Sequence, residues 1–140
     1  MHTLPPQNVS NGTKPQHKGF RRPILEILED LSKPVPDRFI STRRQGGTEI
    51  KYISWVNICK LLEYFCPGYE WEIDIHYGGD RIYVVGKLTI WAEEGRFSRS
   101  ATGTELSSLD KFGDPSSNAE AMSIRRSAAK FGLGRELWTK

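Results

Sequence analysis

Two stretches of the sequence gather basic side chains beside an aromatic ring or small residues. In the first stretch, Arg43 and Arg44 precede the glycine pair at 46–47, and Lys51 and Tyr52 follow it. Cations of this kind neutralise phosphates, and aromatic rings stack on the unpaired bases of single strands. The stretch therefore predicts contacts with a single-stranded nucleic acid. A basic hairpin without a ligand is an equally good alternative.

The second stretch, residues 118–134, carries the adjacent pair Arg125 and Arg126 and then Lys130. At helical spacing Arg126 and Lys130 stack one turn apart, and Arg125 lies at the margin. Arginine suits a track of phosphates because its planar fork donates two hydrogen bonds to one phosphate. A solvated helix face with cations near its C-terminus is the alternative. The opposite face should pack closely on a sheet, and it consists of Ala121, Ile124, Ala128 and Phe131.

Residues with catalytic potential are sparse. His76 stands among polar residues without a partnered nucleophile, and the two cysteines have no second pair of metal ligands. There is no GxxxxGK motif of the kind that binds ATP phosphates. We expect a protein that is not an enzyme and has no catalytic residue, metal or cofactor. The alternative is a metal-dependent nuclease, for which no basic or histidine partner has catalytic spacing; its acids would be Glu70, Glu72 and Asp74.

The size and charge of the chain set its class. Its 140 residues suit one domain, and 20 basic residues against 17 acidic ones give a net charge of +3. The two cysteines, Cys59 and Cys66, lie outside any regular framework, as is usual in a reducing compartment. No window has the apolar length of a membrane span, and the N-terminus has no apolar signal core. We therefore expect a cytoplasmic, nucleoid-associated protein.

Hydrophobic periodicity predicts an α+β domain over residues 23–140, behind a disordered basic arm at 1–22. The last helix should begin at Ser117, because Ser117 and Glu120 have the spacing of a capping box. A β-hairpin is expected near the N-terminal side, and an antiparallel meander of three to four strands with helices on one face. The expected helices cover residues 24–31, 55–65 and 117–131. The expected strands cover residues 39–43, 49–53, 70–77, 81–92 and 96–102.

Both basic stretches resemble the Rad-fifty-two/DdrA superfamily of single-strand annealing proteins. The segment 39–53 is similar to that family's serine–arginine, glycine-turn and tyrosine hairpin. The segment 118–134 is similar to the helix that ends in the family's basic pair and Phe-Gly. A Gly-Tyr-Glu-Trp entry to a strand at 68–71 lies between them, and the similarity covers about residues 24–138.

The resemblance implies a homo-oligomeric ring with a positive outer groove. Single-stranded DNA would lie in this groove with its bases outward, so that complementary strands anneal without ATP during recombination and double-strand break repair. The resemblance assigns DNA contacts to Arg43, Tyr52, Arg125 and Arg126. It does not identify a recombinase or nuclease partner.

The sequence departs from the family pattern at two places. The family has a further basic residue where this chain has Ala129, and the neighbouring Lys130 leaves the helix in another direction. Eukaryotic members have a lysine of a second, outer DNA site where this chain has Glu93 and Glu94. The resemblance therefore implies the groove but not the outer site.

A general single-stranded DNA- or RNA-binding module that does not anneal is the alternative function. In such a module Tyr83 and Trp91 would form a stacking platform on the sheet. Packing at a subunit or helix contact explains the same two aromatic residues without a ligand.

Overall fold

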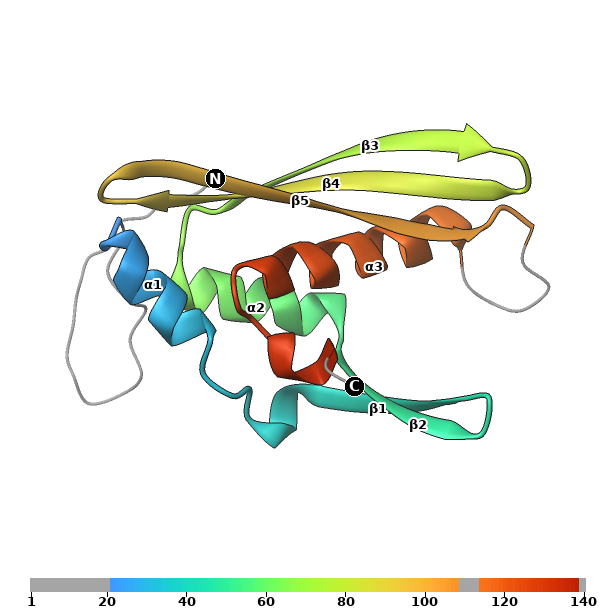
Figure 1. Cartoon of the computed structure of the whole chain (residues 1–140), viewed down its shortest axis with the longest axis horizontal. Coiled ribbons are helices and arrows are strands. Elements are labelled where there is room, and N and C mark those ends of the chain that lie inside the picture. Colours follow the sequence, from blue (N-terminus) through green and yellow to red (C-terminus); the bar gives the residue numbers. More distant parts are fainter. Residues whose placement is uncertain (1–20, 109–113, 139–140) are drawn as a thin grey trace.

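A three-stranded antiparallel sheet covers three helices, and a short β-hairpin lies on the far side of those helices (Figure 1). The computed structural model describes residues 21–108 and 114–138, so most of the arm predicted at 1–22 lies outside the described residues. The helices are α1 (Ile24–Leu31), α2 (Trp55–Phe65) and α3 (Pro115–Lys130), with 3₁₀ turns η1 (Asp37–Phe39) and η2 (Arg135–Trp138). The strands are β1 (Ile40–Gln45), β2 (Thr48–Ile53), β3 (Glu70–Gly78), β4 (Arg81–Ala92) and β5 (Gly95–Leu106).

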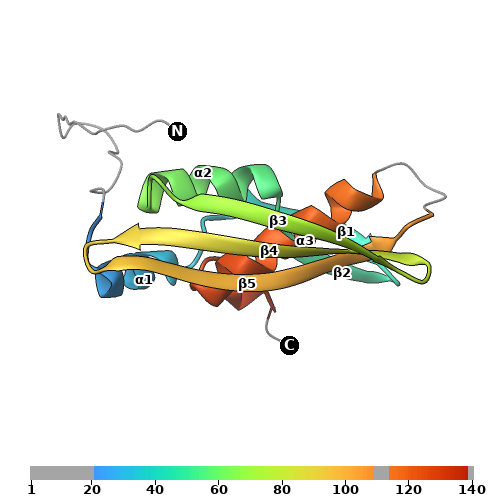
Figure 2. The same cartoon turned by 90° about the horizontal axis from the view of Figure 1, so that it is seen from above.

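The sheet has the order β3-β4-β5, and its alternating residues explain why one face is covered. In the central strand β4 the residues on the helix side are buried, which confirms the predicted alternation. They are Ile82, Val84, Leu88 and Ile90. The predicted α+β class and N-terminal hairpin are also confirmed, although β1 and β2 form a separate two-stranded sheet. Figure 2 shows the strands running the length of the molecule across the helices.

Helix α3 packs very closely on the sheet because small residues face each other. Ser123 is fully buried and its hydroxyl donates a hydrogen bond of 2.8 Å to the carbonyl of Ala101 in β5. A Cβ atom added at Gly103 would overlap the carbonyl oxygen of Ala119. Gly86 of β4 likewise faces Ser123 and the ring of Trp71. The predicted close approach of helix and sheet is therefore confirmed, and two sheet glycines make it possible. The closest contacts come from Ala119 and Ser123, however, and Ala121 of the predicted face is only partly buried.

The predicted start of α3 and its capping box are wrong. The helix begins at Pro115, two residues before Ser117, and Asp114 is the N-cap residue. Proline is favourable in the first helical turn because its missing N–H would have no partner there. The carboxylate of Asp114 accepts a hydrogen bond of 2.8 Å from the Ser117 hydroxyl. Glu120 instead accepts a hydrogen bond of 2.8 Å from Trp71 Nε1, which ties α3 to β3.

The hydrophobic core lies between the helices and the sheet. Its largest fully buried side chains include Ile27 and Leu31 of α1, Leu62 of α2 and Leu88 of β4. Phe131, directly after α3, is 1% exposed and closes this core. Among the described residues, no helix is long and apolar enough to cross a membrane.

Arg22, at the start of the described chain, is fixed to the domain. Its guanidinium bonds to the carboxylate of Asp30 at 2.9 Å and to the carbonyl of Phe65 at 3.0 Å. Its own carbonyl accepts a hydrogen bond from the amide of Glu93. Through its side chain and its main chain, this residue of the predicted arm therefore helps to hold α1, α2 and the β4–β5 turn together.

Candidate nucleic-acid interface

The β1–β2 hairpin presents Arg43 and Tyr52 on one face. Gly46 and Gly47 form its turn with φ of +60° and +81°, a conformation that glycine adopts without strain. This turn sets the register in which Arg43 pairs with Ile50 and Ser41 pairs with Tyr52. Because side chains alternate along strands, Arg43 and Tyr52 are diagonal neighbours on the same side.

Arg43, Tyr52 and Arg125 form what we call the Tyr52 cluster. The guanidinium carbon of Arg43 lies 5.2 Å from the centre of the Tyr52 ring, and that of Arg125 lies 5.5 Å from it. Both distances are typical of cation–π contacts. Helix α3 supplies Arg125 and the hairpin supplies the other two residues, so the cluster joins both basic stretches of the sequence.

The Tyr52 cluster concentrates positive charge. Burial lowers the pKa of Arg125, and the charge of Arg43 lowers it further. No ion pair between described residues includes either arginine. An arginine stays charged despite such a shift, so the cluster holds two like charges without an acid between them.

The other two basic residues predicted in the hairpin lie in different places. Lys51 lines a small hollow of about 100 Å³ together with the Tyr52 cluster. Arg44 is at the exposed end of the hairpin, where its guanidinium donates a hydrogen bond of 3.4 Å to the Gly47 carbonyl. The structure thus places Lys51 at the hollow but not on the hairpin face of Arg43 and Tyr52, because adjacent strand residues point to opposite faces. Arg44 lies outside this hollow.

Arg126 and Lys130 were predicted on the side of α3 that faces away from the sheet, and this orientation is wrong. Arg126 donates a hydrogen bond to the main-chain carbonyl of Thr102, and Lys130 donates one to the carbonyl of Ser100. Both acceptors belong to β5, an edge strand of the sheet. Its outward carbonyls have no strand partner in the described chain, so the long cationic side chains of α3 satisfy them.

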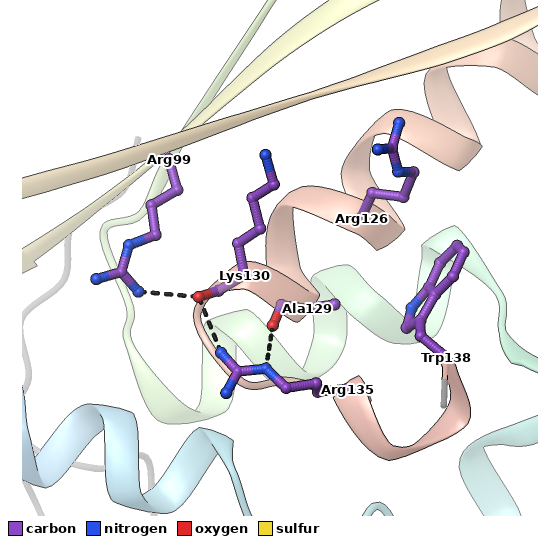
Figure 3. Close-up of a pocket in the computed structure, with 6 residues that line it drawn as sticks. All are labelled: Arg99, Arg126, Ala129, Lys130, Arg135 and Trp138. Carbon is purple, nitrogen blue, oxygen red and sulfur yellow. Dashed lines mark hydrogen bonds between the residues drawn. The ribbon is translucent and has the colours of Figure 1, made fainter. Parts of the chain in front are cut away.

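A larger hollow of about 550 Å³ lies beside these cations at the end of α3 (Figure 3). Trp138 lines both hollows and is 46% exposed, so the two hollows are neighbours. The residues that line the larger one are Arg99, Arg126, Ala129, Lys130, Arg135 and Trp138.

Sequence reasoning missed Arg99, Arg135 and Trp138. Arg99 is part of β5, where nothing in the strand pattern distinguishes it from a solvated cation. Arg135 and Trp138 follow the glycines that end α3, and the 3₁₀ turn η2 returns them to the helix. The available signal was the continuation of basic residues past the helix C-terminus, where cations are favoured by the helix dipole.

On the open sheet face, Trp91 of the proposed stacking platform already contacts other side chains of the protein. Trp91 Nε1 donates a hydrogen bond of 2.9 Å to Glu70. The guanidinium carbons of Arg21 and Arg96 lie 4.6 Å and 5.3 Å from its ring centre. Tyr83 is 38% exposed. A base would therefore have to displace arginine contacts in order to stack on Trp91.

The acids considered for a metal-dependent nuclease do not converge. Within residues 21–108 and 114–138, no group of three or more histidine, cysteine or acidic side chains is arranged to hold a metal ion. Glu70 accepts the hydrogen bond from Trp91, and Glu72 forms an ion pair with Lys87. The geometry of these acids gives no support to metal-assisted cleavage.

Sequence comparison identifies proteins that are similar to this chain. The chain is 36% identical over 123 residues to the DNA repair RAD52-like protein 1, mitochondrial, of Arabidopsis thaliana, covering 86% of this chain and 70% of that protein. It is 33% identical over 122 residues to the DNA repair RAD52-like protein 2, chloroplastic, of the same plant, covering 84% of this chain. The chain spans 61% of that second relative, and no family model matches its sequence.

Proposed function

The chain belongs to the family of RAD52-like DNA repair proteins, and on this basis we propose that it binds single-stranded DNA and anneals complementary strands. The DNA would lie along the hollows beside α3, with its phosphates against the basic side chains. Annealing would need no ATP and no catalytic residue, because base pairing and stacking supply the free energy. We further propose that the protein acts in the cytoplasm, on DNA of the nucleoid.

The Tyr52 cluster is the observation that carries this proposal. Arg43 and Arg125 are held over one ring although their charges repel each other. A phosphate placed between them would relieve this repulsion and accept hydrogen bonds from both guanidinium groups. Each phosphate contact would also release counterions, so affinity should fall steeply with salt.

The arrangement favours binding without recognition of base sequence. The cations of α3 and the hairpin suit phosphates, which all sequences share. Bases that face away from these cations stay free to pair with a second strand. The protein would then accelerate annealing by concentrating and aligning two strands.

We propose that the working form is a homo-oligomeric ring, as the family resemblance implies. Large apolar side chains that remain exposed in the single chain would help to form its subunit contacts. They include Leu25 of α1, which is 76% exposed, and Trp55 of α2, which is 55% exposed. Analytical ultracentrifugation tests this directly, and a monomer at all concentrations would contradict it.

The function is tested by mixing two complementary dye-labelled oligonucleotides with the protein, without ATP or metal, and following energy transfer. We expect pairing well above the spontaneous rate, lost when both Arg125 and Arg126 are replaced by Gln. Arg96→Gln is the matched control, because Arg96 contacts Trp91 and lines neither hollow. Circular dichroism and sedimentation establish that each variant is folded and assembled.

Two outcomes would count against annealing. Tight single-strand binding without faster pairing would favour the general binding module instead. If the native protein neither binds single strands nor accelerates their pairing, the proposed function is rejected altogether.

A further inference from the structure

The larger hollow at the end of α3 gathers four cations from three elements. Arg126 and Lys130 come from α3, Arg99 comes from β5, and Arg135 comes from η2 (Figure 3). No ion pair between described residues includes any of these four. A hollow with this charge is suited to an anionic ligand.

Arg99 and Arg135 are held in place by the carboxyl end of α3. Arg99 Nη1 donates a hydrogen bond of 2.9 Å to the Lys130 carbonyl, and Arg135 Nη2 donates one of 3.1 Å to the same oxygen. Arg135 Nε donates another, of 3.0 Å, to the Ala129 carbonyl. The dipole of a helix C-terminus favours cations in this position. Both guanidinium groups are therefore oriented before any ligand arrives.

These contacts leave donors available for a ligand. A guanidinium has five N–H donors, and the hydrogen bonds above use one nitrogen of Arg99 and two of Arg135. The guanidinium carbon of Arg99 also lies 4.6 Å from the centre of the Phe131 ring, a cation–π contact that further holds this side chain in place. The small side chain of Ala129 lies between the cations and keeps the hollow open.

Trp138 connects this hollow with the Tyr52 cluster. It lines both hollows, and nearly half of its surface is exposed. Two other tryptophans, Trp71 and Trp91, have their indole N–H groups bonded to carboxylates. An exposed indole beside a row of cations is the arrangement that binds a nucleotide by stacking and charge together.

We infer that Arg99, Arg135 and Trp138 form a second nucleotide subsite of the groove. Arg99 and Arg135 bind a backbone phosphate, and the Trp138 ring stacks on the base of an adjacent nucleotide. The strand therefore continues from the Tyr52 cluster, past Trp138, to the carboxyl end of α3. This inference rests on the proposed single-strand binding and adds three residues to it.

The test measures the affinity of an oligothymidylate for the assembled protein over a range of salt concentrations. The double variant Arg99→Gln/Arg135→Gln should reduce the slope of log affinity against log salt by roughly 0.7, the value for one lost phosphate contact to a single strand. Arg96→Gln should leave the slope unchanged, because Arg96 and Arg99 lie on opposite faces of β5. Arg125→Gln serves as the positive control for the groove.

Trp138 is tested by a pair of substitutions. Trp138→Leu should weaken binding about tenfold, on the scale of one lost base stack. Trp138→Phe should retain most of the affinity because it keeps an aromatic face. Intrinsic fluorescence quenching by the oligonucleotide should be reduced in both variants.

The outcomes separate this subsite from the proposed function. If Arg125→Gln weakens binding while the Arg99, Arg135 and Trp138 variants bind like the native protein, the subsite is rejected and the groove remains. If the native protein binds no single strand, both the subsite and the proposed function are rejected. Should the glutamine variants fail to fold, Ala129→Glu places an anion in the hollow and leaves the main-chain contacts intact. Unchanged binding by that variant would equally overturn the subsite.

Discussion

Arg43 and Arg125, which are 82 positions apart in the sequence, contact the same tyrosine ring. One comes from the hairpin and the other from α3, and both guanidinium groups lie within 5.5 Å of the Tyr52 ring centre. The ring attracts each cation, whereas the cations repel each other. In the free protein this repulsion offsets part of the cation–π attraction, and an anion bound between the two guanidinium groups would offset the repulsion.

Arg43→Gln should separate stability from binding. It removes one cation–π contact and one repulsion with Arg125, so we expect the free energy of unfolding to change by no more than about 0.5 kcal/mol. Single-strand affinity should fall several-fold, with a shallower salt dependence. Urea unfolding and a salt titration of binding measure the two effects. A large loss of stability would show that Arg43 is chiefly a structural residue.

Tyr52 can be tested as the support of both arginines. Tyr52→Phe keeps the ring face and should bind DNA within about twofold of the native protein. Tyr52→Ala removes both cation–π contacts and should cost about 1 kcal/mol of binding free energy, roughly fivefold in affinity. Filter binding or fluorescence anisotropy gives the comparison. Equal affinities for the alanine and phenylalanine variants would rule out this supporting role.

Gly103→Ala should destabilise the fold because it disturbs the packing of α3 on β5. The added methyl group would overlap the Ala119 carbonyl and push α3 away from β5. Overpacking of this kind costs about 2 kcal/mol. Chemical denaturation measures the loss, and Gly95→Ala, at a turn where the added atom meets nothing within 4 Å, separates steric overlap from backbone strain. A Gly103 variant as stable as the native protein would contradict the close packing of α3.

Cys66 gives a prediction about pH. Burial raises the pKa of its thiol from 9.0 to about 12, and Arg22 opposes part of this rise. Below pH 9 the thiol is neutral in both the folded and the unfolded chain. Between pH 9 and 12 only the unfolded chain ionises at this site, so the free energy of unfolding should decrease as pH rises.

Urea unfolding of the native protein and of Cys66→Ala at pH 8 and pH 10 isolates this contribution. The native protein should lose more stability over that interval than the variant does. Identical losses in the two proteins would mean that Cys66 ionises as readily in the folded chain as in the unfolded one.

The order of the elements and the family were accessible from sequence. Alternation in β4 and the helical spacing of Ile124, Ala128 and Phe131 predicted which residues are buried, because burial follows a simple period. The family resemblance is confirmed by the plant relatives. Arg43, Tyr52 and Arg125 meet in the structure as a cluster, and their contacts with DNA stay a prediction.

The remaining features depend on contacts between distant residues. Glu120 has the spacing of a capping residue, but Trp71 is nearer in space and takes its carboxylate. Arg126 and Lys130 turn toward β5 because that strand has unpaired carbonyls, which a helical projection does not include. Trp138 reaches the groove only because η2 folds back on α3. No local pattern encodes these three arrangements.

The hydrogen bonds of Arg126 and Lys130 to Thr102 and Ser100 also make the two edges of the three-stranded sheet different. At these positions side chains already occupy the main-chain acceptors on the free edge of β5, so these acceptors are not open to hydrogen bonds from an added strand. Among the described residues, no such side-chain hydrogen bonds reach the free edge of β3, and Tyr77 on that strand is 76% exposed. A strand from another chain that extended the sheet would therefore pair with β3 rather than with β5.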